Sequence, residues 1–201
     1  MRVSPGNKKI GKIANVSLTP IKSCAGCEQH CAKDCYAIKA YRMYPAVRNA
    51  WDHNYEQATN DLGGFFSEIF TSLKKYKGEY FRWHVAGDLL NPHYFMGVLD
   101  VAEHFPNIKF LLFTKQYSIV NEVERQWDLE RRDFPSNLQI VFSAWPGRTM
   151  YNPHNFPVAW MQDGTEDRVP ESAIHCPGSC ETCNACWGLG KAGIDVVFNK
   201  H

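Results

Sequence analysis

Eight cysteines in two short segments, one near each end of the 201-residue chain, carry the chemistry that is easiest to read from spacing. They form two quartets, Cys24-x2-Cys27-x3-Cys31-x3-Cys35 and Cys176-x3-Cys180-x2-Cys183-x2-Cys186. Thiolates bind soft metals, and four thiolates in one short segment can enclose a single metal centre. The spacing therefore predicts two metal centres, one in each segment.

The kind of centre follows from how the cysteines are spaced. Iron–sulfur loops place cysteines two or three residues apart on one irregular segment, whereas structural zinc more often joins two distant Cys-x2-Cys pairs. The spacing favours iron–sulfur clusters, and two [4Fe–4S] clusters are the simplest count. Zinc is the alternative, because it also takes four thiolates and one quartet could be a zinc staple for the irregular C-terminal region. One cysteine, such as Cys27, could be free or could bind the other centre.

The redox state of these thiols depends on the compartment. Residues 1–12 contain no apolar stretch, so we expect no secretory signal. No apolar run approaches the length of a membrane span, so we expect no membrane partner. We therefore expect a cytoplasmic protein, in which thiols stay reduced and disulfides are disfavoured.

The charge balance limits the classes of partner. The chain has 22 Lys and Arg against 21 Asp and Glu, a net charge of +1. This balance creates no global field that would attract nucleic acid or an acidic membrane surface. The basic residues are scattered rather than striped, which counts against a nucleic-acid-binding module without excluding one. A redox partner or a small-molecule substrate is the expected partner class.

A second group of reactive side chains lies in the segment YFRWHVAGD, which begins at Tyr80. In a strand over 80–85, alternate side chains point to opposite faces, so Arg82 and His84 should share a face, with Asp88 following beyond the strand. A buried parallel strand is usually apolar on both faces. These three polar residues are therefore candidate catalytic residues, although they could also form a satisfied buried ion pair.

Polar residues also follow two further predicted strands. Lys115 follows the strand over 108–114, and Ser143 and Trp145 end the strand over 138–143. The carboxyl ends of neighbouring parallel strands meet at one rim, where α/β folds bind their ligands. Lys115, Ser143 and Trp145 are therefore candidate cofactor-binding residues.

The hydrophobic pattern predicts the elements that position these residues. Strands are expected over 13–18, 80–85, 108–114, 138–143, 156–161 and 194–198. Helices are expected over 36–60, interrupted at Pro45, and over 65–76, 92–104 and 118–131, the last with Ser118 as its N-cap. Alternating strands and helices predict a parallel sheet with right-handed crossovers, in one α/β domain spanning 1–201. A partial barrel or an open parallel sheet fits the count of βα units.

Four segments occur together in a recognisable order. They are Cys24…Cys31-x3-Cys35-Tyr36-Ala37, the run from Arg82 to Asp88, the strand end Phe113-Thr114-Lys115, and Cys176-Pro177…Cys186-Trp187. Their order and types resemble the phage gene product eighty-eight family over most of the chain. That family is in turn similar to radical S-adenosylmethionine (SAM) enzymes, which have a partial (β/α) barrel.

The resemblance implies a radical-SAM-like partial (β/α) barrel with cysteine-rich loops near both termini. It implies a catalytic cluster on Cys24, Cys31 and Cys35, while Gly87 and Asp88 stand where the superfamily holds the amino group of SAM. The second quartet would hold an auxiliary cluster. The usual Cys-x3-Cys-x2-Cys spacing is absent from the first segment and occurs instead from Cys176 to Cys183.

Two other functions stay open from the residues alone. One is a non-catalytic iron–sulfur protein for electron transfer or redox sensing, without a substrate. The other is a zinc-stapled binding module. A phage-encoded protein of any of these kinds would act in the host cytoplasm.

Overall fold

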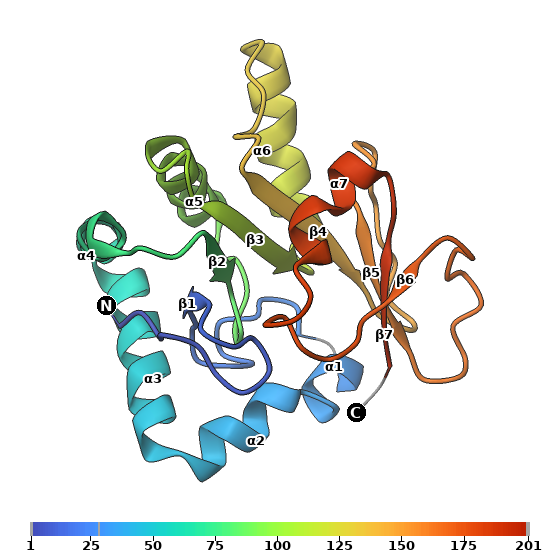
Figure 1. Cartoon of the computed structure of the whole chain (residues 1–201), viewed down its shortest axis with the longest axis horizontal. Coiled ribbons are helices and arrows are strands. Elements are labelled where there is room, and N and C mark those ends of the chain that lie inside the picture. Colours follow the sequence, from blue (N-terminus) through green and yellow to red (C-terminus); the bar gives the residue numbers. More distant parts are fainter. Residues whose placement is uncertain (1, 28, 200–201) are drawn as a thin grey trace.

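The computed structural model describes residues 2–27 and 29–199, and its centre is one seven-stranded sheet (Figure 1). All pairings are parallel, in the order β1-β2-β3-β4-β5-β7-β6. The strands are β1 (Ala14–Val16), β2 (Tyr80–Trp83), β3 (Lys109–Thr114), β4 (Leu138–Ala144), β5 (Val158–Gln162), β6 (Ile174–His175) and β7 (Val196–Asn199). The predicted α/β class and parallel sheet are confirmed.

Helices connect most of these strands. They are α1 (Gln29–Lys33), α2 (Tyr36–Met43), α3 (Pro45–Asn60), α4 (Leu62–Lys75), α5 (Pro92–His104), α6 (Tyr117–Leu129), the 3-10 helix η1 (Ala185–Gly188) and α7 (Leu189–Ala192). Proline is favoured at the first helical position, so Pro45 separates α2 from α3 as predicted. The Asn91 side chain caps α5 by accepting a 2.8 Å hydrogen bond from the Tyr94 N–H.

The two faces of the sheet pack against different layers. On β3, Phe110 and Leu112 join the larger core, to which α4, α5 and α6 contribute their apolar faces. Leu111 on the same strand belongs to a second core with Leu189 of α7. The helix η1 contacts β3 and β4 and lies across the sheet in Figure 1. The C-terminal cysteine segment therefore covers the face opposite the helices.

The strand order limits the architecture. From β1 to β5, each strand neighbours the next along the chain. Barrels of βα units have this sequential order, whereas doubly wound sheets reverse their order at a switch point. In the described residues the sheet ends at β1 on one side and β6 on the other. The carboxyl ends of all its strands lie at one rim, as the sequence predicts for parallel strands.

Several predicted boundaries are corrected by the structure. Ser118 is not an N-cap, because α6 already begins at Tyr117 and Gln116 takes the capping position without a side-chain cap bond. The strand predicted over 80–85 ends at Trp83. The short strand β6 and the helix α1 inside the first cysteine segment were not predicted, because two- and five-residue elements leave no periodicity to detect.

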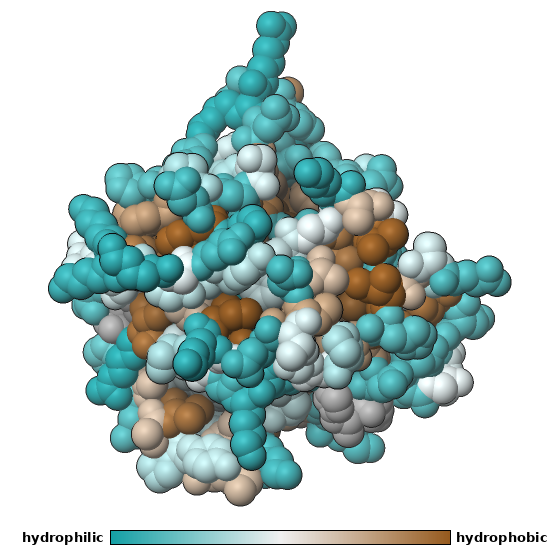
Figure 2. Space-filling model, in the orientation of Figure 1, coloured by the Kyte–Doolittle hydropathy of each residue, from teal (hydrophilic) through white to brown (hydrophobic). Residues whose placement is uncertain are grey.

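The view in Figure 2 shows the surface of the face that carries the C-terminal segment. Hydrophilic residues dominate it, and an apolar area lies over β5 and β7. Ile174 and Phe198 in this part of the sheet are only partly buried. Over residues 2–27 and 29–199, every helix is too short or too polar to cross a bilayer.

Candidate functional site

The first cysteine segment begins at the carboxyl end of β1 and is attached to the chain that follows β2. The Leu18 N–H donates a 2.9 Å hydrogen bond to the Ala86 carbonyl. Gly87 has a φ of +89°, and a Cβ at this position would lie 2.6 Å from the Ser23 hydroxyl oxygen. Glycine is therefore required here both for its backbone conformation and for the close approach of the loop.

The cysteines of this segment lie on a turn and a short helix. The Cys27 N–H donates a 3.0 Å hydrogen bond to the Cys24 carbonyl, and Gly26 between them has a φ of +67°. Cys31 lies on α1, and Cys35 directly precedes α2. Residue 28 of the segment lies outside the described residues. All four cysteines therefore lie on one short loop and helix that follow the carboxyl end of β1.

Burial disfavours the thiolate forms of Cys24 and Cys27. Burial raises the pKa of Cys24 to about 12, and the nearby Asp88 carboxylate contributes in the same direction. Burial also raises the pKa of Cys27 to about 11, with Cys31 and Cys35 contributing next. Cys27 therefore lies close to these two thiols. A bound cation would favour the thiolate forms.

The second cysteine segment is fixed by backbone hydrogen bonds to two distant parts of the chain. The Cys176 N–H donates to the Val197 carbonyl at 3.0 Å, which extends the pairing of β6 with β7. The Cys180 N–H donates to the Lys9 carbonyl at 2.9 Å. The N-terminal residues and the C-terminal quartet are therefore neighbours.

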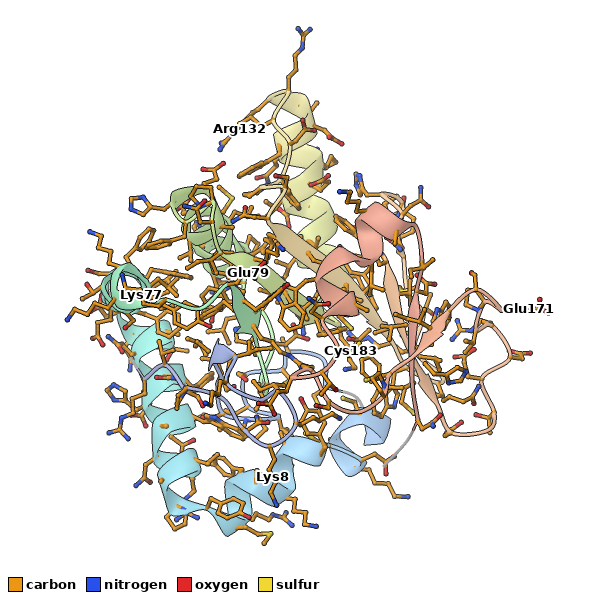
Figure 3. All side chains as sticks on the ribbon, viewed as in Figure 1. Lys8, Lys77, Glu79, Arg132, Glu171 and Cys183 are labelled. Atoms are coloured by element: carbon orange, nitrogen blue, oxygen red, sulfur yellow. The ribbon has the colours of Figure 1, made fainter. Side chains whose placement is uncertain are left out.

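Trp187 anchors the end of this segment at the amino ends of β2 and β3. Its indole N–H donates to the Lys109 carbonyl at 3.0 Å, and its ring packs edge-on against Tyr80 with centroids 5.2 Å apart. The Asn184 amide adds a 2.8 Å hydrogen bond to the Tyr80 hydroxyl. These contacts hold η1 against the sheet, and Figure 3 shows Cys183 on the loop that precedes it.

The thiols of the second quartet also influence one another. Burial raises the pKa of Cys186 to about 12, and Cys176 and Cys180 are the next causes. Burial likewise raises the pKa of Cys180, whereas the Arg82 guanidinium opposes the rise at both Cys180 and Cys186. A cation therefore already faces this quartet.

All eight cysteines are free thiols and half-buried, so both predicted quartets are available as ligands. Within residues 2–27 and 29–199, no three Cys, His, Asp or Glu side chains converge closely enough to hold a metal ion. The donor set fits a soft metal, since each segment offers four thiols on irregular backbone. Binding would require each loop to contract, as is usual when ligands assemble around a metal.

Arg82 lies near the second quartet and near Tyr36, the residue that follows the first quartet. Its guanidinium carbon lies 5.0 Å from the centroid of the Phe113 ring, and its Nε is buried without a hydrogen-bond partner. Its positive charge acts on Cys180 and Cys186 and also on Tyr36, which follows Cys35. The catalytic role predicted for Arg82 stays a prediction.

His84 does not share the face of Arg82, contrary to the expected alternation. The strand ends at Trp83, so the two-residue period no longer applies at His84. The His84 ring is buried, with Nε2 2.9 Å from the Tyr94 hydroxyl on α5. Burial, with a smaller contribution from Arg82, lowers its pKa to about 3. His84 is thus packed on the helix side of the sheet as a neutral imidazole, and its catalytic role stays a prediction.

Asp88 ties the ends of β2 and β3 together. Its carboxylate accepts hydrogen bonds from the Thr114 hydroxyl at 2.6 Å, the Lys115 N–H at 2.9 Å and the Leu89 N–H at 2.8 Å. The side chain is buried, and burial raises its pKa although these hydrogen bonds oppose the rise. Asp88 therefore shapes the rim next to Cys24 through its neighbours.

The predicted rim residues Lys115 and Trp145 meet beside the first cysteine segment. The Lys115 ammonium lies 5.1 Å from the Trp145 ring centroid, a cation–π contact. The Arg148 guanidinium donates to the Lys115 carbonyl at 2.9 Å and to the Gly26 carbonyl at 3.1 Å. Arg148 thereby links the cysteine turn to the ends of β3 and β4.

Next to this contact lies a polar cavity of about 480 Å³, between the loops that follow β4 and β5. Arg148, Met150, Glu166 and Arg168 are among its lining residues. The predicted residue Ser143 lies at the end of β4, where its carbonyl accepts a hydrogen bond from the Tyr117 hydroxyl. The carboxyl rim thus offers a small-molecule-sized space.

Some contributors to the site were not predicted. The Gln116 side chain donates to the Ala25 carbonyl and so holds the first cysteine turn from the end of β3. Its position directly after Lys115 is the one signal that could have identified it. Lys9 carries no signal at all, since its carbonyl and its ammonium, 5.8 Å from the Tyr36 ring centroid, become relevant only in the folded chain.

Comparison with known proteins gives two similar phage sequences. The Gene 88 protein of Mycobacterium phage D29 is 28% identical over 152 residues, which cover 70% of this chain and 60% of that protein. The Gene 88 protein of Mycobacterium phage L5 is 26% identical over 209 aligned positions, which cover 97% of this chain and 81% of that protein. No solved structure matches the chain.

The family match extends over all the residues of the candidate site except those after residue 188. The family model described as Gene product 88 matches residues 3–188, a range that includes both cysteine quartets, the rim residues and the strands β1 to β6. Because this match covers most of the sequence, the chain belongs to the Gene product 88 family.

Proposed function

We propose that this protein binds two iron–sulfur clusters, one in each cysteine quartet, and acts as a radical-SAM-like enzyme in the host cytoplasm of a phage. The observation that carries the proposal is the arrangement of eight free thiols on two loops, with the Arg82 charge acting on Cys180 of the second loop and on Tyr36 beside the first. The sequential order of the parallel strands β1 to β5 supports a partial barrel. The first cysteine loop also follows β1 at the carboxyl rim, where such folds place their sites.

The first cluster would be held by Cys24, Cys31 and Cys35. The resemblance to radical SAM proteins favours this set, which leaves one iron open for a small ligand. Cys27 would then be a spare thiol, close to Cys31 in the structure. The side chains would come together by closing the turn at Gly26, which has no side chain to obstruct the movement.

The second cluster would be held by Cys176, Cys180, Cys183 and Cys186. Four protein ligands close a centre, so this cluster would carry electrons or stabilise the C-terminal segment rather than bind substrate. The hydrogen bonds of Cys176 and Cys180 to Val197 and Lys9 would fix its distance from the first cluster. The Arg82 guanidinium would lower the cost of the negative charge of this second cluster.

A cluster held by Cys24, Cys31 and Cys35 would supply one electron to a cosubstrate such as SAM. The chain's own contribution would be to position that molecule and exclude water. Lys115, Trp145 and Arg148 already lie together at the rim, and the adjacent cavity of about 480 Å³ is of a size that takes small ligands. Asp88 would act by fixing Thr114 and Lys115, whose positions define this wall.

Metal and sulfide analysis of oxygen-free protein tests the cluster proposal. We expect a brown protein with iron and acid-labile sulfide in equal amounts, sufficient for two clusters. The matched variant Cys31→Ala should lose the iron of one cluster, and Cys183→Ala should lose the iron of the other. A colourless protein that contains zinc would replace the proposal with the zinc-stapled alternative.

Binding and cleavage of SAM test the enzymatic part. Calorimetry should show SAM binding to the clustered protein, and chemical reduction should release 5′-deoxyadenosine. A protein with two clusters that neither binds nor cleaves SAM would instead be an electron-transfer or redox-sensing protein. The closed second quartet is the feature that favours this second candidate.

A further inference from the structure

The near-zero net charge of the chain conceals an uneven distribution of charge. Residues 1–51 contain nine Lys and Arg, and their only acids are Glu28 and Asp34, so this part carries a net charge of +7. Of the 22 basic and 21 acidic residues in the whole chain, the other 13 and 19 lie in 52–201, a net charge of −6. A charge asymmetry of this size indicates a polyanionic partner for the basic part.

The basic residues of this part are scattered along the sequence, but the fold collects several of them around α1 and α2. The N-terminal residues run beside these helices in Figure 1, and Figure 3 shows Lys8 next to α2. The Lys9 ammonium lies 5.8 Å from the centroid of the Tyr36 ring, which confirms the contact. We call this surface the basic face and define it by Lys8, Lys33, Tyr36, Lys39, Arg42 and Tyr44.

The cations of the basic face are available to a ligand. Their side chains are exposed, and within residues 2–27 and 29–199 none of the four forms an ion pair or a hydrogen bond. Lys39 and Arg42 are three residues apart on α2, so they share one side of the helix. Lys33 of α1 lines the same groove of about 560 Å³. A row of free cations along a groove matches the repeated phosphates of a nucleic-acid strand.

Two exposed tyrosines lie at the ends of α2. Tyr36 is its first residue and Tyr44 is its C-cap, and each is 55% exposed. A separation of eight residues corresponds to roughly 12 Å along a helix axis. The Tyr36 hydroxyl donates a hydrogen bond to the Val85 carbonyl, which fixes the orientation of the ring. Exposed rings beside cations can stack on unpaired bases, whereas a duplex, an acidic protein or an acidic membrane surface would be attracted by the charge alone.

We propose that the basic face binds single-stranded nucleic acid along α2. Lys8, Lys33, Lys39 and Arg42 would contact the phosphates, and bases would stack on the two tyrosine rings. The groove between α1 and α2 is large enough to receive an unstacked base. The proposal goes beyond the cluster and SAM proposals, because none of these contacts involves a cysteine. Fluorescence anisotropy with labelled oligonucleotides therefore tests it separately from iron analysis.

The charge contacts are tested with single strands of twenty thymidines or twenty uridines and the full-length, anaerobically purified protein. The tighter of the two identifies DNA or RNA as the ligand. Lys39→Gln/Arg42→Gln should raise the dissociation constant at least tenfold at low salt. The slope of log K against log salt should become shallower by about 1.4, because each lost phosphate contact contributes about 0.7 on a single strand. The matched control Lys74→Gln/Lys75→Gln, at the end of α4, should change the constant less than twofold.

The stacking contact is tested with Tyr44→Ala, which should raise the dissociation constant at least fivefold and leave the salt slope unchanged. Tyr151→Ala is the matched control, because Tyr151 is 70% exposed on the loop after β4 and its carbonyl accepts a hydrogen bond from Asn121 of α6. It should change the constant less than twofold.

Several outcomes would overturn the proposal. It is wrong if neither single strand binds, if a duplex of the same length binds as tightly as the single strand, or if the α4 control loses as much affinity as Lys39→Gln/Arg42→Gln. It is also wrong if phosphatidylserine vesicles bind while Tyr44→Ala leaves the affinity for oligonucleotides unchanged. That result would assign the basic face to an acidic membrane surface.

Discussion

The Thr114 hydroxyl at the end of β3 donates a 2.6 Å hydrogen bond to the Asp88 carboxylate, which lies beyond the end of β2. The Lys115 N–H donates to the second oxygen of the same carboxylate at 2.9 Å. One buried carboxylate thus joins two strand ends at the rim where the first cysteine segment is attached. The geometry makes Asp88 a positioning residue, and its effect on any ligand should be transmitted through Thr114 and Lys115.

Asp88→Ala should therefore reduce both stability and affinity for SAM. The free energy of unfolding should fall by roughly 2–4 kcal/mol, because the Thr114 hydroxyl and the Lys115 N–H lose a buried acceptor. Thr114→Val keeps the carboxylate and should cost about 1 kcal/mol. Urea unfolding and SAM calorimetry measure the two effects. Unchanged SAM affinity in folded Asp88→Ala would exclude this rim as the SAM site.

Much of the scaffold could be predicted because its signals are local. The run from Ile108 to Thr114 is apolar on both faces, as a strand covered on both sides must be, and helices before and after it implied parallel pairing. Pro45 fixed the division between α2 and α3. The face of His84 could not be predicted, because nothing in the residues shows that β2 stops at Trp83. Where a strand ends is decided by its neighbours.

Gly87→Ala should disturb the first cysteine segment without touching a cysteine. A Cβ at this position would lie 2.6 Å from the Ser23 hydroxyl oxygen and 2.8 Å from the Leu18 Cβ, and the φ of +89° disfavours any side chain. We expect a loss of about 2 kcal/mol or more in unfolding free energy and reduced iron content. Gly63→Ala on α4 is the matched control.

At Gly63 an added Cβ would meet nothing closer than 4.0 Å, so alanine there should be neutral or stabilise by up to about 1 kcal/mol. Chemical unfolding and iron analysis of the two variants side by side make the comparison. Equal behaviour of the two alanine variants would mean that the close packing at Gly87 does not position the loop.

His84 should make stability depend on pH in mildly acidic solution. Burial lowers its pKa from 6.5 to about 3. Between pH 6.5 and pH 3, His84 is therefore protonated in the unfolded chain and neutral in the folded chain. Stability is therefore complete above pH 6.5 and falls as the pH drops, at ~1.4 kcal/mol per unit, or roughly 2 kcal/mol by pH 5. His84→Gln should remove this slope in urea unfolding at pH 7 and pH 5. A slope that persists unchanged in the variant would assign it to other groups.

The cysteine quartets could be predicted from the sequence more easily than any other part of the site. Which cysteine of a quartet binds the metal could not be predicted. Cysteine spacing identifies a quartet from type and order alone. Which thiols come together depends on the fold of the loop, and the structure places Cys27, rather than Cys24, close to both Cys31 and Cys35. Resemblance and geometry thus favour different third ligands, and substitution can separate them.

Cys24→Ala should lose the iron of the first cluster, and Cys27→Ala should retain it. The first change removes a proposed ligand, whereas the second removes the spare thiol. Both positions lie on the same turn, joined by a 3.0 Å hydrogen bond, so each variant controls for the disturbance of the other. Iron and sulfide counts after anaerobic purification provide the measurement. Loss of iron only in Cys27→Ala would transfer the ligand role to that residue.

Arg82→Met should lower the reduction potentials of the clusters while leaving their iron content unchanged. A reduced cluster carries one more negative charge, and the Arg82 guanidinium faces Cys180 and Cys186 as well as the Tyr36 side of the first loop. Methionine keeps much of the length and apolar stem of arginine, and it removes the charge together with the guanidinium contact to Phe113. The shift should be on the order of tens of millivolts, since a unit charge about 8 Å away contributes roughly 2 kcal/mol at an effective dielectric constant of about 20.

Arg132→Met is the matched control for this potential shift. Arg132 also stacks on an aromatic ring, with its guanidinium carbon 3.9 Å from the Trp127 centroid, and it lies far from Cys183 in Figure 3. Potentiometric titration followed by electron paramagnetic resonance should show a shift in Arg82→Met and none in Arg132→Met. Because the Arg82 charge acts on the second quartet and on Tyr36 beside the first, both clusters should shift in the same direction, the second by more. A shift confined to one cluster would mean that Arg82 serves that loop alone, and the electrostatic link between the two centres would be lost.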